Sequence, residues 1–520
     1  MTRLVALSLL LLVAGPATAV RAASPSAAVL ERIDRLVEER MDANGVPGAA
    51  VAIVADGRLV HARGFGTADG EDRRVTPDTP FLLGSTTKSF TALAVMQLVD
   101  AGKVQLDASV RRYVPEFQLA GGSADQITVR HVLQHVSGLP PNTEGGPILK
   151  AAGDGTPEQA IAEIRGQAPA ADPGAEMDYV NANYVLAGLI VERASGEPFG
   201  SYVEREIFEP IGMSQSFADP EPALRAGLAA GHRYVFGFTD RTGPTFRPAM
   251  LATGYLMSSA RDLARYLATL LNDGVTADGT RVVSSASLRT LLTPGRPETE
   301  LGPWADGASS RYAMGWFVGG PWKEPAILHP GDTADTSSLL VMMPQRGLGV
   351  VTLVNASNEL AVPGNPTAIG RLERNVVDVL VGERPDTGTS VHRFYLVFDI
   401  VVLALLAAAT VALTRSVRDV RTRRPPTHRR RSIVGMLGRV LLVGVALGYP
   451  LLTGLGWTAT WAWHPDLALV LLVLGVLLAA TTTVRLGWLL RTRPSVAPPP
   501  VTGDGSEAPP PTARSLESTA

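Results

Sequence analysis

The stretch "FLLGSTTKSFTALAVMQLVDAG", residues 81–102, is apolar almost all round a helical period once its polar start is passed. A helix that is apolar on every face lies inside a protein rather than on its surface. Gly102 follows the last periodic residue, where a glycine commonly ends a helix. The stretch therefore predicts a core helix that begins at about Ser85, with the other elements packed around it.

Ser85 stands one helical turn before Lys88, so the two side chains share one face of this helix. Lysine is rare in the chain: of 47 basic residues only four are lysines, Lys88, Lys103, Lys150 and Lys323. A desolvated lysine can lose its proton and act as a base, whereas arginine stays protonated. The N–H groups at a helix start also stabilise developing negative charge. The pattern is typical of a nucleophile beside its base.

A plainer interpretation fits the same stretch. Ser85 would cap the helix with its hydroxyl, and Lys88 would be a solvated charge on the helix surface. Residues 81–102 alone support the two interpretations equally, so the rest of the sequence has to decide between them.

Composition and motifs exclude several function classes. The chain has no cysteine, which removes disulfides, thiolate nucleophiles and Cys-ligated metal sites. Its net charge of −2 gives no overall attraction to nucleic acid, and no nucleic-acid partner is expected. The Gly-x-Ser-x-Gly turn of α/β-hydrolases is absent. "HVLQH", residues 131–135, has ligand-like spacing, but Val132 replaces the glutamate of a zinc protease. We expect neither a metal nor a cofactor.

The N-terminal part divides into a leader and one large domain. Residues 1–23 combine Arg3, an apolar run and small residues, which is typical of a secretory signal peptide; a retained signal anchor is the alternative. Residues 24–384 read as a soluble domain in which helical periods alternate with short apolar runs. Within it, residues 46–66 predict a β-hairpin that turns at Asp56-Gly57. Residues 385–393 read as a linker.

The C-terminal part is predicted to be membrane-embedded. Three stretches have about the length and the apolar composition of a transmembrane helix, residues 394–413, 433–457 and 467–484. The loop between the first two, residues 414–432, carries eight arginines, and further arginines open the Pro-rich tail, residues 485–520. The positive-inside rule places both segments in the cytoplasm and the soluble domain outside.

The predicted outer loop, residues 458–466, contains Trp461 and Trp463, and Trp457 lies just before it. Tryptophan at this position is typical of a belt at the membrane–water interface. We therefore expect a multi-pass protein of the cell membrane whose first partner is the lipid bilayer.

Two later segments carry polar side chains that suit a substrate cleft. "PGAEMDYVNANYVLAGLIVE", residues 173–192, places Tyr179 and Asn181 just before a helix-like apolar run. "HPGDTADTSSLLVMMPQRGLGVVTLVN", residues 329–355, begins at His329-Pro330-Gly331 beside strand-like runs, where a glycine lets a strand edge approach a ligand. Taken singly, each also has a structural explanation as an anchor, a cap or a core histidine.

Taken together, the order and wording of these motifs resemble the serine β-lactamase and penicillin-binding-protein superfamily, in particular its class C-like β-lactamase-related hydrolases. The resemblance rests on residues 46–66, 81–117, 127–140, 173–199 and 329–355. It implies an α+β fold, with an antiparallel sheet flanked by helices and a mostly helical subdomain inserted. In this chain three transmembrane helices would follow that domain.

The resemblance also implies roles for single residues. Ser85 would be the acylated nucleophile, Lys88 its base, and Tyr179 the residue that shares proton transfer with the leaving group. Asn181 would contact the substrate. No metal takes part in this chemistry.

The motif at residues 329–331 matches the family's strand triplet, so His329 and Gly331 would border the bound substrate. The backbone N–H groups of Ser85 and Asp332 would form the oxyanion hole. Pro330 departs from the usual threonine and supplies neither a hydroxyl nor an N–H to a substrate carboxylate. We therefore expect esterase or peptidase activity more than β-lactam hydrolysis.

The sequence hypothesis is a membrane-tethered extracytoplasmic serine hydrolase that cleaves an ester or amide in a small or peptide substrate, with cell-envelope compounds as one source. A second hypothesis belongs to another class: a sensor or scaffold that binds a wall fragment or β-lactam without turnover. The set Ser85, Lys88 and Tyr179 favours the enzyme.

Overall fold

The computed structural model describes residues 24–140, 155–243, 246–295, 310–357, 367–422, 429–452 and 456–491. The predicted signal peptide and residues 492–520 of the predicted tail lie outside the described residues, as do residues 423–428 of the basic loop.

A seven-stranded antiparallel sheet forms the centre of the domain, with the strand order β2-β1-β11-β10-β9-β8-β7. Its strands are β1 (Gly48–Ala55), β2 (Arg58–Gly66), β7 (Ser310–Tyr312), β8 (Phe317–Gly319), β9 (Ala326–Asp332), β10 (Ser337–Met343) and β11 (Leu348–Val354). The first and last strands in sequence lie beside each other, because β1 pairs with β11. The sheet is thus closed by residues from both ends of the domain.

The predicted hairpin at residues 46–66 is confirmed as β1 and β2. Asp56 and Gly57 form its turn, with φ values of 51° and 73°. Two consecutive residues with positive φ match the twist of the flanking strands, and Asp-Gly is a favoured pair there.

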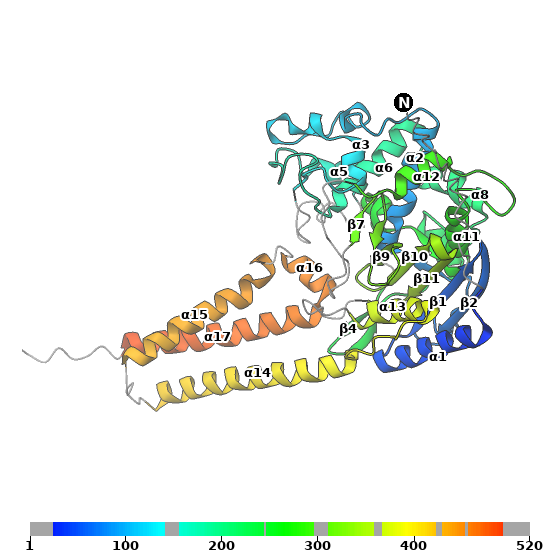
Figure 1. Cartoon of the computed structure of the whole chain (residues 1–520). Coiled ribbons are helices and arrows are strands. Elements are labelled where there is room, and N and C mark those ends of the chain that lie inside the picture. Colours follow the sequence, from blue (N-terminus) through cyan, green and yellow to red (C-terminus); the bar gives the residue numbers. More distant parts are fainter. Residues whose placement is uncertain are drawn as a thin grey trace, which may run out of the picture.

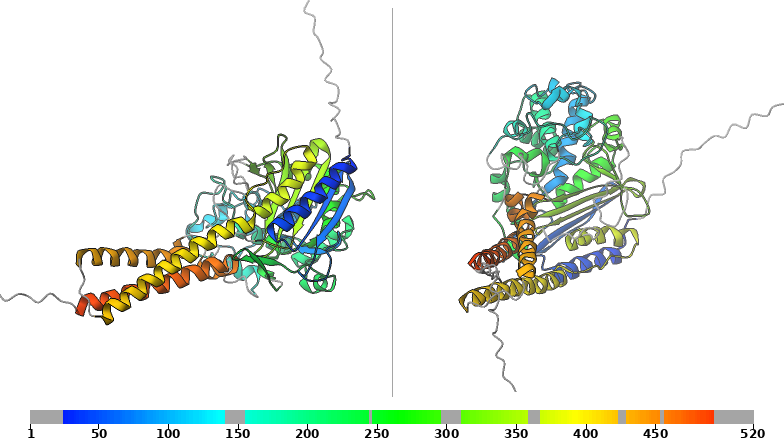
Figure 2. Two further views of the ribbon diagram at one scale, coloured as in Figure 1. Left: turned by 90° about the horizontal axis from the view of Figure 1, so that it is seen from below. Right: turned by 90° about the vertical axis from the view of Figure 1, so that its left-hand side faces the viewer.

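Helices cover both faces of the sheet. On one face α1 (Ala27–Asn44) and α13 (Ala368–Val381) run side by side, as Figure 2 shows. On the other face α11 (Ala260–Leu271) packs on β1, β2 and β11. Each face therefore has its own hydrophobic core, which explains why every residue of β1 is buried.

The chain between β2 and β7 is mostly helical, and Figure 1 shows many of its helices gathered at the end of the domain away from α1. Its described α-helices besides α11 are α2 (Thr87–Asp100), α3 (Val129–Leu133), α5 (Pro157–Ala162), α6 (Asn181–Ser195), α7 (Phe199–Val203), α8 (Glu209–Ile211), α9 (Pro220–Arg225), α10 (Leu251–Gly254) and α12 (Ser285–Leu292). Its short strands are β3 (Pro80–Leu82) paired with β6 (Met257–Ser259), and β4 (His232–Val235) paired with β5 (Phe238–Arg241).

The predicted core helix is confirmed as α2. Every residue of α2 from Thr87 to Met96 is buried, and α6, α10 and α12 pack against it. A single 3₁₀ turn, η1 (Gly84–Thr86), precedes α2 and carries Ser85. The α+β class and the antiparallel sheet flanked by helices are confirmed with it.

Two of the three predicted membrane spans correspond to helices that are candidates to cross a bilayer. Among the described residues, α14 (Val391–Arg421) and α17 (Pro465–Arg491) have the length and composition to cross a bilayer. The helix at the second predicted span, α15 (Arg429–Leu452), begins with arginines and carries Arg439 within its apolar part.

Figure 1 shows α14, α15 and α17 leaving the domain together as a bundle of long helices. The predicted outer loop is largely a short helix, α16 (Gly456–Trp463), which lies where this bundle meets the domain. Helix α14 begins inside the predicted linker, because Ser390 caps it with its side chain.

Candidate active site

Ser85 sits where η1 meets the edge of β9. Gly84 has a φ of 58°, which bends the chain before Ser85, and a Cβ on Gly84 would lie 2.7 Å from the backbone nitrogen of Asp332. Gly331 is equally tight, since its Cβ would lie 2.3 Å from the carbonyl oxygen of Leu83. The two glycines thus let the turn of Ser85 and the strand of Asp332 touch backbone to backbone.

Lys88 is fully buried one turn after Ser85, on the first turn of α2. Its Nζ donates to Ser85 Oγ at 2.9 Å and to the carbonyl oxygen of Thr253 at 2.8 Å. The ring centroid of Tyr179 lies 5.0 Å from the same Nζ. Burial lowers the pKa of Lys88 from 10.5 to about 7, since the charged form loses its hydration. A neutral amine is thus available to Ser85 near neutral pH.

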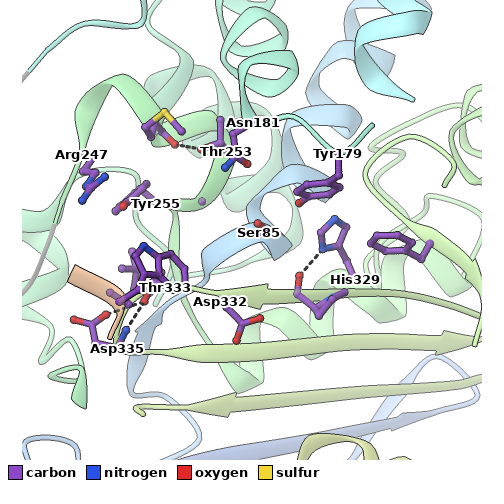
Figure 3. A pocket seen from close by; sticks show the side chains of 17 residues that line it. Ser85, Tyr179, Asn181, Arg247, Thr253, Tyr255, His329, Asp332, Thr333 and Asp335 are labelled. Atoms are coloured by element: carbon purple, nitrogen blue, oxygen red, sulfur yellow. Dashed lines mark hydrogen bonds between the residues drawn. The ribbon is translucent and has the colours of Figure 1, made fainter. Parts of the chain in front are cut away.

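Tyr179 lies just before α6, and Asn181 is the first residue of α6. Burial raises the pKa of Tyr179, so its phenol stays protonated and can donate. The Tyr179 hydroxyl lies close enough to Ser85 for the serine to influence that pKa, and Figure 3 shows the tyrosine ring beside Ser85. Asn181 Oδ1 is buried without a hydrogen-bond partner in the described part of the chain. Both side chains are therefore open to a bound substrate.

His329 lies on β9 at the border of the site, but both of its ring nitrogens are engaged. Nδ1 is 2.6 Å from the carbonyl oxygen of Pro330, which can only accept, so Nδ1 carries the proton. Nε2 then accepts from the hydroxyl of Tyr312 at 3.2 Å. Burial, assisted by the charge of Lys88, lowers the pKa of His329 to about 3. His329 is thus a neutral side chain held in place by the protein.

A cavity of about 490 Å³ opens over Ser85. Five of the predicted site residues line this cavity, and Figure 3 shows them around it: Ser85, Tyr179, Asn181, His329 and Asp332. Lys88 lies beneath Ser85, and Gly331 supports the floor from β9. The structure therefore brings every predicted site residue to one place.

Several residues of the site are absent from the sequence prediction. An aromatic group surrounds Tyr179, with ring centroids of His135 and Tyr312 at 4.3 and 5.9 Å. His135 Nδ1 accepts from the backbone N–H of Val180, which fixes the residue between Tyr179 and Asn181. Burial holds the pKa of His135 well below 6.5. These residues orient the tyrosine.

The only sequence signal for this group was the pair of histidines in "HVLQH". In the structure His131 takes part in the N-terminal cap of α3, which ends at Leu133. His135 follows with a φ of 56°, outside the helix. The two histidines therefore do not share a helix face, so the i, i+4 pairing that their spacing suggests is not formed.

The opposite wall of the cavity comes from other segments. Arg247, Met250 and Tyr255 flank α10, and Trp463 comes from α16. No acidic side chain forms an ion pair with Arg247 within the part of the chain that the structure describes. Nothing in the local sequence around residues 247–255 marks them, because they meet Ser85 only through the tertiary fold.

The pKa of Lys88 gives a pH prediction. Only the neutral amine can accept the Ser85 proton, and this form is present above the pKa. The rate of Ser85 acylation is expected to fall about tenfold per pH unit below pH 7 and to level off above about pH 8. Reaction with a nitrophenyl ester, followed from about pH 5 to about pH 9, measures this profile.

The other groups around Ser85 do not produce this profile. His329 and His135 titrate far below pH 7, and Tyr179 titrates above its ordinary value. A rate that stays level down to about pH 5 would contradict a role for neutral Lys88.

Comparison with known proteins places this geometry in context. A family model described as Beta-lactamase matches residues 33–371. Penicillin-binding protein 4 of Amycolatopsis lactamdurans is 32% identical over 337 residues, which cover 61% of this chain and 84% of that protein. The octameric penicillin-binding protein homologue from Pyrococcus abyssi superposes with a TM-score of 0.59 at 29% identity, covering 69% of this chain and 78% of its own.

A further relative extends past the family match. Protein flp of Staphylococcus aureus (strain N315) is 24% identical over 477 residues, which cover 88% of this chain and 91% of that protein. The aligned part of this chain is longer than residues 1–371, where the family match ends. The alignment therefore includes part of the C-terminal segment.

Proposed function

The chain belongs to the Beta-lactamase family of serine hydrolases, and from that premise we propose that it cleaves an ester or amide through an acyl-enzyme on Ser85. The observation that carries the proposal is the contact of 2.9 Å between Ser85 Oγ and the buried Nζ of Lys88, whose pKa lies near 7. A helix-capping serine beside a solvated lysine would show neither feature.

In the proposed first step neutral Lys88 takes the proton of Ser85 while Oγ attacks the carbonyl carbon of the substrate. The carbonyl oxygen becomes an oxyanion between the backbone N–H groups of Ser85 and Asp332, which the close contact of η1 and β9 supports. The intermediate then collapses, the bond to the leaving group breaks, and the acyl group stays on Ser85.

The leaving alkoxide or amine needs a proton as it departs. Tyr179 lines the cavity beside Ser85 with a protonated hydroxyl, so it donates to the leaving group and regains a proton from Lys88. Water then attacks the acyl carbon, and the same two groups take its proton and return one to Ser85 Oγ. The products are the free acid and the alcohol or amine.

The arrangement at Pro330 favours esters and peptides over β-lactams as substrates. Pro330 offers no donor, and both ring nitrogens of His329 are engaged. The strand triplet is therefore a poor anchor for a substrate carboxylate. Asn181, which has an unpaired Oδ1, is the remaining polar contact from the predicted set.

We also propose that α14 and α17 tether the enzyme in the cell membrane with the domain outside. Their length and composition suit a bilayer, and the arginines of the basic loop are expected on the cytoplasmic side. Helix α15, which packs against α17, would return the chain across the membrane between α14 and α17.

A fluorophosphonate probe tests the proposed chemistry. The full-length protein is expected to bind the probe covalently, Ser85→Ala to lose all labelling, and Ser201→Ala, an exposed serine on α7, to keep it. A membrane-impermeant form of the probe should label intact cells, and labelling only after lysis would contradict the orientation.

Turnover separates the enzyme from the sensor. Nitrophenyl esters, a chromogenic cephalosporin and D-alanyl peptides are offered to the labelled preparation in parallel. Release of product from one of them supports the hydrolase. An adduct at Ser85 that never hydrolyses would favour the sensor. A wild-type protein that no probe labels would contradict both the hydrolase and the sensor.

A further inference from the structure

One wall of the Ser85 cavity does not belong to the hydrolase domain. Trp463, the last residue of α16, lines the cavity together with Leu82 and Tyr255 of the domain. More than 70 residues of chain, including the whole of α14 and α15, separate Trp463 from the end of α13. The C-terminal apolar segment therefore returns to complete the site (Figure 1).

Specific contacts hold the domain against this segment. The carboxylate of Asp466, buried at the start of α17, accepts from the backbone N–H of Phe236 at 3.3 Å. Gly237, beside it in the β4–β5 turn, has space for no side chain, because a Cβ would lie 2.8 Å from Cβ of Tyr395 on α14. Trp463 is three residues from Asp466, so its position follows from a docked helix rather than a free loop.

A further bond fixes the other end of the same junction. Asn44 Oδ1, at the end of α1, accepts from the backbone N–H of Val391, the first residue of α14. Val391 and Tyr395 are buried in the same core as α1 and α13. The domain thus has a set orientation relative to α14 and α17, and its cavity opens beside α16.

The chemistry of the junction is that of a membrane surface. Side chains farther along α14 and α17, such as Leu396, Leu403 and Val476, are about half exposed or more, as expected for lipid contact. Trp457, Trp461 and Trp463 gather on α16, at the ends of these helices. Indole rings prefer the level of the lipid headgroups, so the cavity mouth lies at that level.

We propose that Trp463 determines substrate specificity, and that the Ser85 cavity takes the acyl-bearing head of an amphiphile whose tail stays in the bilayer. The proposal rests on the proposed acyl-enzyme hydrolase and its membrane tether. A cavity of about 490 Å³ holds a small headgroup but not a long apolar tail as well. The apolar face of Trp463 contacts the part of the substrate that leads from the headgroup to the bilayer.

The test uses the full-length chain in phosphatidylcholine vesicles and two ester probes with the same acyl and leaving groups. One probe is water-soluble, and the other carries a dialkyl tail that anchors it in the vesicle. Trp463→Ala is expected to lower kcat/KM for the anchored probe about tenfold, and to lower it clearly less for the soluble probe. Trp461→Ala is the matched control, since Trp461 lies on the same helix but outside the cavity.

Each other outcome overturns the inference. Equal losses on the two probes would mean that Trp463 lines the cavity without distinguishing anchored from soluble substrates. No loss on either probe would mean that Trp463 does not contact the substrate. A loss of the same size in Trp461→Ala would point to membrane insertion alone. Fluorophosphonate labelling of Trp463→Ala shows that Ser85 is still active, whereas a wild type that is never labelled refutes the hydrolase itself.

Discussion

Lys88→Met is expected to lower the rate of Ser85 acylation on the order of 10³-fold. Met fills a similar volume but has no nitrogen to accept the Ser85 proton, and Nζ of Lys88 is the basic atom in contact with Ser85 Oγ. A positioned general base contributes about 10²- to 10⁴-fold. The rate of nitrophenol release under single-turnover conditions measures the loss directly.

Two further variants make the result specific. Lys88→Arg keeps a positive charge that arginine cannot lose, so acylation is expected to fail there as well. Lys103→Met changes an exposed lysine just after α2 and should leave the rate unchanged. Thermal unfolding of each variant reports whether the fold survives, because a guanidinium buried at position 88 costs stability. Acylation by folded Lys88→Met at the wild-type rate would exclude Lys88 as the base.

The parts of the fold that local sequence determines were predicted. The hairpin at Asp56-Gly57 and the buried helix α2 follow from turn chemistry and from apolar periodicity, which act within a few residues. The strand order was not deduced from such patterns, because pairing of β1 with β11 joins residues about 300 positions apart. The family resemblance implied an antiparallel sheet flanked by helices, but no strand order was predicted.

The candidate site likewise contains residues that local motifs predicted and residues that no local motif marks. Ser85, Lys88, Tyr179 and Asn181 lie in two short motifs, so a reader of the sequence can select them. Arg247 and Trp463 carry no motif, and they reach the cavity only after α10 and α16 have packed.

The membrane segment shows the limit of composition as a guide. Residues 433–457 are apolar on average, yet the helix there, α15, opens with arginines and carries Arg439 within its apolar part. Hydropathy counts residues along the chain, whereas a span depends on an unbroken length of apolar helix. The sequence also predicted a loop at residues 458–466, where the structure has α16, because the tryptophans there are typical of a membrane–water interface.

Tyr179→Phe is expected to lower turnover by about 10²- to 10³-fold for substrates with poor leaving groups. The phenol stays protonated because burial raises its pKa, so it is suited to donate a proton rather than to accept one. Lys88, with a pKa of about 7, supplies the base. The hydroxyl matters most when the departing group is a strong base that must be protonated.

The leaving group therefore distinguishes this role from a structural one. Alkyl esters and amides, which release strongly basic groups, should show the full loss in Tyr179→Phe, whereas a nitrophenyl ester should lose less than about tenfold. The phenylalanine ring keeps the packing against His135 and Phe317, so the cavity should keep its shape. An equal loss for all leaving groups would mean that Tyr179 acts on the attack of Ser85 instead. Comparing single-turnover rates across a series of esters with one acyl group decides between the two.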